Sequence, residues 1–285
     1  MANGVRRDLA LDERDRLSEQ ERALIGAMLD CLVAEIADEL AASLASGWAA
    51  ANDPQREQLV GTLKRHGLLD DDALVALLLR RAEEERAAQA VRSRSARRES
   101  RFLQSLVSHA NGPVAAAAMA LVLARGRRRD RLGQCLVTID DLDPRALARL
   151  AALVAAALRP ALVAGQGARA ADEALATALS ALRGRHDPDR GIDRLSAELV
   201  GLFDATGGLD DPILLAAAAD GEIAFLAQAL ARRAGLDPLV AQDELLSGDA
   251  ARIMALLRMG GASRDLAAGL IAGSGEWIGL DDEGG

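Results

Sequence analysis

The arginines in the middle of the chain are the residues whose type and spacing could do chemistry. The guanidinium group of arginine is a planar donor that grips a carboxylate or a phosphate with two parallel hydrogen bonds. Residues 80–131 carry 13 basic and 5 acidic side chains, a net charge of +8, and all 13 basic residues are arginines. Ten of them form what we call the arginine band, a candidate anion-binding or partner-binding surface: Arg92, Arg94, Arg97, Arg98, Arg101, Arg125, Arg127, Arg128, Arg129 and Arg131.

Two interpretations of the arginine band compete. In the first, the band binds a phosphorylated partner, an acidic protein or a nucleic acid. In the second, the band is a solvated helix face whose cations balance the negative end of a helix dipole. For any particular ligand the second interpretation is the stronger, because runs of charge usually serve solvation.

The charge and the aromatic content of the whole chain weaken the nucleic-acid version. The flanking segments 1–79 and 132–285 carry net charges of −7 and −10, so the 285-residue chain has a net charge of −9. Aromatic residues make up only 2% of the chain, which leaves few side chains to stack on bases. A protein partner is therefore favoured over a nucleic acid.

The other polar motifs do not complete a catalytic, metal or cofactor site. Four carboxylates have roughly the spacing of a calcium loop, but the glycine of such a loop is displaced from the sixth place to the fifth, at Gly191: Asp187, Asp189, Asp193 and Glu198. Residues 165–167 (GQG) echo a dinucleotide fingerprint without the preceding strand, so we expect a helix–helix turn. Three histidines sit far apart beside predicted turns: His66, His109 and His186. We expect no enzymatic activity, no metal and no cofactor.

The elements that position the arginine band are predicted to be helices. Hydrophobic residues make up 50% of the chain and come from Ala, Leu and Val, which disfavours an all-β protein. Apolar residues recur every three or four positions from residue 24 to 44, and Ser18 with Glu21 forms a capping box, so a helix is predicted from 18 to about 46. The uncharged run 102–124 is long enough to span a membrane, but the polar residues in its first half predict two helices around a turn instead.

Aspartate–proline pairs and glycines are predicted to mark helix ends. Asp accepts hydrogen bonds from the free amides of a first turn, and Pro loses nothing at the first helical position. The five pairs are at 53–54, 143–144, 187–188, 211–212 and 237–238. Glycine favours the left-handed residue that ends many helices, and the predicted stops are Gly67, Gly126, Gly184, Gly207, Gly235 and Gly260. The pattern predicts roughly a dozen helices, with residues 135–139 (CLVTI) left as a loop.

The predicted architecture is an all-α, HEAT-like helical-repeat array, an α-solenoid with two lobes. The boundary is placed in the polar, turn-rich stretch RGRHDPDRG. The predicted parts are an N-terminal tail (1–17), an N-terminal helical-repeat lobe (18–183), a linker (184–191), a C-terminal helical lobe (192–274) and an acidic tail (275–285). Trp277 in that tail is expected to dock back on the last helices, with an interaction anchor as the alternative.

Three stretches carry a resemblance to a known family: residues 16–25 (RLSEQERALI), residues 109–162 around the DDL loop, and residues 199–271. They are similar to uncharacterised alphaproteobacterial helical proteins that form a conserved domain family of unknown function with HEAT-like repeats. The resemblance implies an all-α, HEAT-like fold and no defined activity or site residues. This chain departs from the family pattern at 150–154, where small residues replace aromatic ones.

The functional hypothesis is a non-enzymatic protein-interaction or regulatory scaffold of the bacterial cytoplasm that uses a helical-repeat surface with the arginine band. The N-terminus lacks the apolar stretch of a secretory signal, and two cysteines without a paired motif suit a reducing compartment. The alternative is nucleic-acid binding through the arginine band on a HEAT-like concave face. The two hypotheses differ in salt dependence, because phosphate contacts weaken steeply as salt rises.

Overall fold

The computed structural model describes residues 19–44, 53–95, 101–129, 137–247 and 249–274. Thirteen α-helices occupy most of this part of the chain, and none of the residues in these ranges forms a β-strand. The all-α prediction is confirmed. The α-helices are α2 (Glu19–Ser43), α3 (Asp53–Arg65), α4 (Asp72–Ser95), α5 (Arg101–Val107), α6 (Gly112–Arg127), α7 (Pro144–Gln166), α8 (Ala168–Arg185), α9 (Ile192–Ala205), α10 (Asp211–Ala219), α11 (Ile223–Ala234), α12 (Pro238–Leu245), α13 (Ala250–Met259) and α14 (Arg264–Ser274). Three 3₁₀ helices complete it: η2 (Leu68–Asp70), η3 (Ile139–Asp141) and η4 (Pro188–Arg190).

Aspartate side chains cap the N-termini of several helices, as predicted. The carboxylate of Asp143 accepts hydrogen bonds from the amides of Arg145 and Ala146 at the start of α7, and Asp237 caps α12 in the same way. The pair at 187–188 is an exception to the α-helix rule, because Asp187 caps only the short η4. The run 102–124 forms α5 and α6 around a turn, which confirms that prediction.

Two of the predicted glycine stops are wrong. Gly126 and Gly184 lie inside α6 and α8, which each end one residue later. Arginines in the last turn of both helices favour the negative end of the dipole, and a glycine inside a helix costs only about 1 kcal/mol. Gly235 does adopt the left-handed conformation at the end of α11, as expected.

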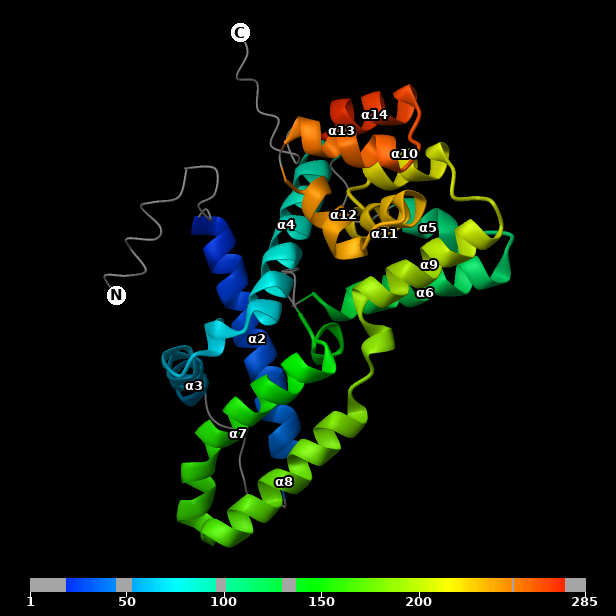
Figure 1. Cartoon of the computed structure of the whole chain (residues 1–285). Helices are drawn as coiled ribbons and strands as arrows, with labels where there is room; N and C mark the ends of the chain where they lie inside the picture. The colour runs from blue at the N-terminus through cyan, green and yellow to red at the C-terminus, as the bar shows by residue number, and fades with distance from the viewer. Residues whose placement is uncertain (1–18, 45–52, 96–100, 130–136, 248, 275–285) are drawn as a thin grey trace.

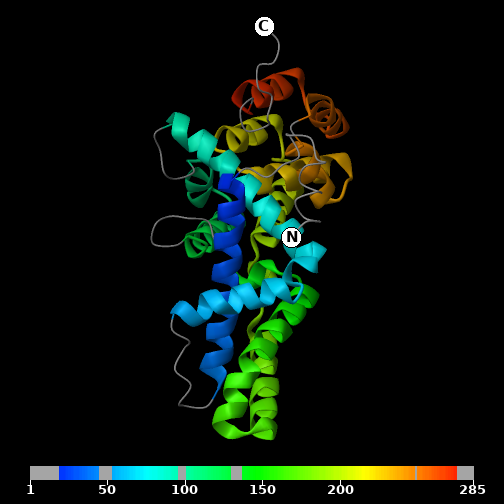
Figure 2. The same cartoon turned by 90° about the vertical axis from the view of Figure 1, so that its left-hand side faces the viewer.

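A first apolar cluster, the N-terminal core, is built from α2, α3, α7 and α8 with the first half of α4. Met28, Leu32 and Ile36 of α2 are fully buried in it, as the helical period of that segment predicts. Figure 1 shows the α7–α8 pair at the lower end of the molecule with part of α2 beside it, and Figure 2 shows α3 lying across α2. By length and composition α7 is the one helix in the described ranges that could cross a membrane, and it packs on α8 and α2 here.

A second apolar cluster, the C-terminal core, contains α5, α6 and α9–α14 with the end of α4. Phe225 is fully buried and stacks edge-on against Phe102 and Phe203, with ring centroids 5.0 and 6.2 Å apart. The α5–α6 pair thus belongs to this core although it precedes the polar connection at 184–191. The domain division predicted at that connection stays a prediction.

The structure joins the two cores through α4 and through the η3 and η4 turns. Leu74 and Leu77 of α4 pack in the N-terminal core, whereas Ala87 packs in the C-terminal core. The charged residues that could do chemistry converge at this join.

Candidate functional site

The arginine band is divided by the fold into inward-facing and outward-facing side chains. Arg128 is buried, Arg125 is partly buried, and Arg101, Arg127 and Arg129 are exposed. The remaining members are not placed: Arg92 and Arg94 belong to α4 without described side chains, and Arg97, Arg98 and Arg131 lie outside the described residues. Among its members with described side chains, the arginine band is therefore not one uniform surface.

Arg128 lies at the join of the two cores and is held by a buried carboxylate. Its Nε and Nη2 atoms donate to the two oxygens of Asp141 at 2.7 and 2.9 Å, a bidentate pair, and the Asp141 side chain is 0% exposed. Arg128 also donates to the carbonyl oxygens of Ala124 and Arg190 at 3.0 and 3.2 Å. Its guanidinium is thus occupied by the protein itself.

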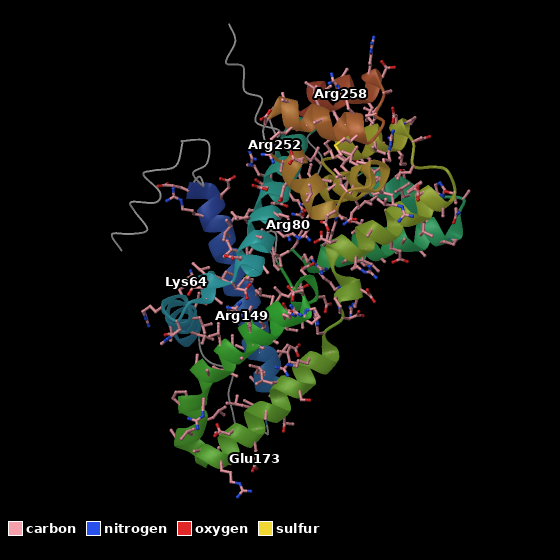
Figure 3. The ribbon with its side chains drawn as sticks, in the orientation of Figure 1. Lys64, Arg80, Arg149, Glu173, Arg252 and Arg258 are labelled. Atoms are coloured by element: carbon pink, nitrogen blue, oxygen red, sulfur yellow. The ribbon has the colours of Figure 1, made fainter. Side chains whose placement is uncertain are left out.

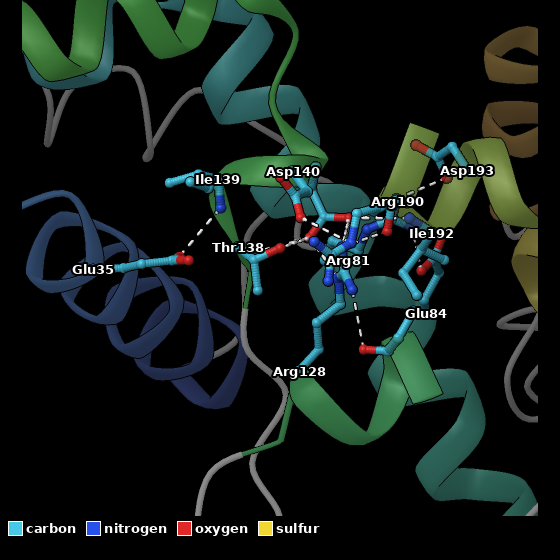
Figure 4. Close-up of polar contacts among 12 residues, drawn as sticks. Glu35, Arg81, Glu84, Arg128, Thr138, Ile139, Asp140, Arg190, Ile192 and Asp193 are labelled. Carbon is cyan, nitrogen blue, oxygen red and sulfur yellow. Dashed lines mark hydrogen bonds and ion pairs between the residues drawn. The ribbon is translucent and has the colours of Figure 1, made fainter. Parts of the chain in front are cut away.

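Asp141 connects three segments that are distant in sequence. Besides Arg128 at the end of α6, it accepts from the amide of Thr138 before η3 and from the amide of Ile192 at the start of α9, at 3.0 and 3.1 Å. Burial alone would raise the pKa of this carboxyl, but the bond from Arg128 and the nearby charge of Arg81 lower it below its ordinary value. Asp141 therefore stays ionised. We call the charged side chains that meet here the ionic junction: Arg81, Glu84, Arg128, Asp141 and Asp193. Figure 4 labels Arg81, Glu84, Arg128 and Asp193 at this place.

Arg81 of α4 provides the second cation of the ionic junction. Its Nη1 atom lies 2.7 and 2.6 Å from the two oxygens of Glu84, and its Nη2 atom lies 2.7 Å from Asp193 of α9. Gln242 of α12 also donates to Glu84. Burial acts to lower the pKa of Arg81, yet the carboxylates around it hold that pKa well above its ordinary value. The junction thus ties α4 to α9 and α12.

Two further members of the band pair with carboxylates of the fold. Arg125 contacts the buried Glu222, which precedes α11, with N–O distances of 2.6 and 2.5 Å. Arg129 lies 3.4 Å from Glu85 of α4. These pairs link the end of α6 to α4 and α11, so they hold the C-terminal core together.

Most of the chain matches the model of one protein family. The model of the family DUF2336, described as an uncharacterised protein conserved in bacteria, matches residues 61–284. The chain belongs to this family. No curated protein and no solved structure matches it. The family supports a bacterial protein of uncharacterised function and agrees with the unknown-function part of the resemblance.

The DUF2336 match includes the whole ionic junction, since all of its residues lie within 61–284. A sequence signal could have predicted which arginines turn inward. Arg125 and Arg128 follow Leu121 and Ala124 at four-residue spacing, on the buried stripe of α6. Arg81, which the sequence argument left out of the band, follows the buried Leu77 and Leu78 on α4 in the same way.

The other sequence motifs of this DUF2336 protein serve the fold. Asp187 caps η4, Asp189 pairs with Arg194 at 3.0 Å, Asp193 pairs with Arg81, and Glu198 is exposed on α9, so the four carboxylates do not converge. No group of His, Cys, Asp and Glu in the described ranges could hold a metal ion. Gly165 and Gln166 are the last two residues of α7, and Gly167 alone connects α7 to α8.

His109 makes a contact within its own turn, whereas His186 contacts a segment 44 residues away. The Nε2 atom of His186 is 3.0 Å from the carbonyl oxygen of Leu142, and the Nδ1 atom of His109 accepts from the amide of Asn111. The His109 ring also meets the edge of Phe203. Cations outside the band are spread over both cores, as Lys64, Arg149 and Arg258 show in Figure 3.

The outer side of α6 carries exposed apolar side chains that take no part in either core. Residues 113–124 contain no charged or polar side chain, and the inner stripe packs in the C-terminal core. On the outer stripe, Met119 and Leu123 are 41% and 56% exposed. Arg127 follows one turn later, also exposed, and makes no ion pair within the described part of the chain. We call this stripe the α6 face: Pro113, Ala116, Met119, Leu123 and Arg127.

Proposed function

We propose that this DUF2336 protein is a non-enzymatic protein-interaction module that binds a partner through the α6 face. The observation that supports the proposal is an apolar helix with one uncovered side. A helix that is apolar all round is normally buried all round, and an exposed apolar stripe with a polar end is typical of a protein-binding surface. Met119 and Leu123 supply the apolar contact, and Arg127 supplies a cation at one end.

The proposal includes a HEAT-like array for the fold and a cytoplasmic location. Neighbouring helices pack as pairs, as in α5–α6, α7–α8 and α11–α12, which is the unit such arrays repeat. A regulatory role fits a scaffold of this kind, because stacked helix pairs offer an extended surface to a partner.

Nucleic-acid binding through the arginine band has less support. Arg125, Arg128 and Arg129 are already paired with Glu222, Asp141 and Glu85, so the charge available for phosphates is smaller than the sequence indicates. A mobility-shift assay with duplex DNA at about 50 mM salt is the check. Binding of the DNA at this low salt, with a steep loss of affinity at physiological salt, would support the nucleic-acid alternative.

The protein-binding proposal is tested by affinity purification from the native host with three forms of the chain. The double variant Met119→Asp and Leu123→Asp places charges on the α6 face. The matched control is Met259→Asp on α13, because Met259 is 56% exposed, as Leu123 is. We expect the same partners with the original chain and the control, and their loss with the double variant.

Circular dichroism and urea unfolding of all three forms show whether the double variant is still folded, so that loss of binding can be told apart from unfolding. Recovery of no reproducible partner, or retention of the same partners by the folded double variant, would overturn the proposal.

A further inference from the structure

We propose that the occupant of the α6 face is the C-terminal segment 275–285 of a second copy of this chain. This inference rests on the proposed function, since it takes the α6 face to be a protein-binding surface, and it names the partner. The segment reads GEWIGLDDEGG and joins apolar anchors to carboxylates. The α6 face joins an apolar stripe to an arginine.

The order of the groups on the α6 face sets the chemistry of its partner. With a rise of about 1.5 Å per residue, Ala116 and Leu123 are separated by about 10 Å along the helix axis, and Arg127 lies about 6 Å further. The heads of Arg125 and Arg129 are 32% and 40% exposed beside it. Because Glu222 and Glu85 already face those two arginines, Arg127 is the cation that an incoming carboxylate meets first. The face therefore suits a segment that is apolar first and acidic afterwards.

The C-terminal segment has that order and a matching length. Trp277, Ile278 and Leu280 precede three carboxylates, at Asp281, Asp282 and Glu283. An extended chain advances about 3.3 Å per residue, so a tail bound in extended form would place Trp277 and Leu280 about 10 Å apart and the first carboxylates within about 7 Å of Leu280. These spacings reproduce those from Ala116 to Leu123 and from Leu123 to Arg127. Tryptophan also makes favourable contacts with a methionine sulfur such as that of Met119.

The position of the last helix makes the contact intermolecular. Helix α14 packs on α10 and ends at Ser274. Figures 1 and 2 both place α14 and α6 at opposite ends of the C-terminal core, with α9, α10 and α11 between them in Figure 1. Trp277 is three residues beyond Ser274, and a fully extended chain of that length spans at most about 11 Å. A tail that begins at α14 thus meets the α6 face of another copy.

Two other observations favour the tail over a direct α6–α6 contact. The α6 face carries one cation and no carboxylate, so a second α6 face offers no counter-charge to Arg127, whereas the tail brings carboxylates to it. The family match continues to residue 284, ten residues beyond the last described helix, so the tail positions belong to the DUF2336 pattern. Each copy offers one tail and one face, which allows two copies to bind reciprocally.

The test is sedimentation velocity of the full chain over a range of concentrations. We expect concentration-dependent self-association that weakens at least tenfold in Trp277→Ala and in Leu123→Asp, and remains in the control Met259→Asp. A charge swap tests the specific contact. Arg127→Glu and the double variant Asp281→Arg with Asp282→Arg should each weaken association, and mixing those two forms should restore it.

Tryptophan fluorescence gives a second measurement. In a Trp48→Phe background Trp277 is the only tryptophan, and its emission should shift to shorter wavelength as the chain associates. A chain that stays monomeric up to about 100 µM, or tail variants that associate as tightly as the original, would overturn the inference. If the α6 double variant still loses its host partners in that case, the proposed function stands with another occupant; if it keeps them, both fail.

Discussion

Replacing Arg128 with methionine removes one cation from the ionic junction and keeps an unbranched side chain that can fill the same space. Asp141 then loses its two charged hydrogen bonds, at 2.7 and 2.9 Å, while the amides of Thr138 and Ile192 still donate to it. The carboxylate stays in a site where it is 0% exposed.

The expected cost is about 3 kcal/mol of unfolding free energy. Breaking a buried pair by removing one partner costs about 3–5 kcal/mol, because the remaining charge is buried without compensation. The lower end applies because Arg81, which also lowers the pKa of Asp141, remains in place. Asp141→Asn in the Arg128→Met background removes the buried charge, but it also turns one of the two acceptor oxygens into an NH₂ group that faces a donor amide, so it should recover less than about 1 kcal/mol.

Urea unfolding followed by circular dichroism measures this cost. The matched control is the pair Arg159–Asp172, which has the same bidentate geometry, at 2.6 and 3.0 Å, and the same separation of 13 residues, but is 46% and 52% exposed. Arg159→Met should leave the unfolding midpoint unchanged within error. Equal midpoint shifts for Arg128→Met and Arg159→Met would refute the argument that burial makes the junction pair strong.

Two further predictions concern other residues at the join. Burial raises the pKa of Glu35 to about 7, and the neighbouring carboxylates Asp140, Glu39 and Asp141 add to that rise. The unfolded chain releases this proton near pH 4.5 and the folded chain only near 7, so Glu35 makes stability fall as pH rises between those values. Glu35→Gln should therefore raise the free energy of unfolding by about 1–2 kcal/mol at pH 8 and leave it unchanged at pH 4. If urea unfolding gives the same difference between variant and original chain at both pH values, this prediction is contradicted. Gly191→Ala should lower the free energy of unfolding by about 2 kcal/mol, because its Cβ atom would lie 2.7 Å from the carbonyl oxygen of Asp140. The control is Gly184→Ala, which has open space around it and should be neutral or stabilising in the same urea titration.

The helices and their caps follow from local rules, which explains why the sequence predicts them well. Asp143 and Asp237 cap helices because an aspartate side chain can reach amides two or three residues ahead. The run 102–124 divides where Asn111 and Pro113 begin α6. These helix boundaries depend on residues that are neighbours in the sequence, so they can be predicted without the tertiary fold.

The partners of the arginines could not be predicted in the same way. Arg125 pairs with Glu222 and Arg81 with Asp193, in each case across a long stretch of sequence. A count of charges locates cations along the chain, but pairing depends on which elements meet in space. The apolar period around Arg81 and Arg128 does indicate that both turn inward, and that signal reduces the exposed part of the arginine band.

The path of the chain through its two cores has a consequence for its synthesis. The first helices lie in the N-terminal core, α5 and α6 in the C-terminal core, α7 and α8 in the N-terminal core again, and α9–α14 in the C-terminal core. A ribosome therefore releases α2 and α3 well before α7 and α8, which complete their packing. Until α9 is made, α6 is outside the ribosome with α5 as its packing partner, so the side of α6 that α9 covers faces water together with its exposed side. The nascent chain can complete its N-terminal core once α8 has emerged, but it exposes α6 to chaperones until its C-terminal half is made.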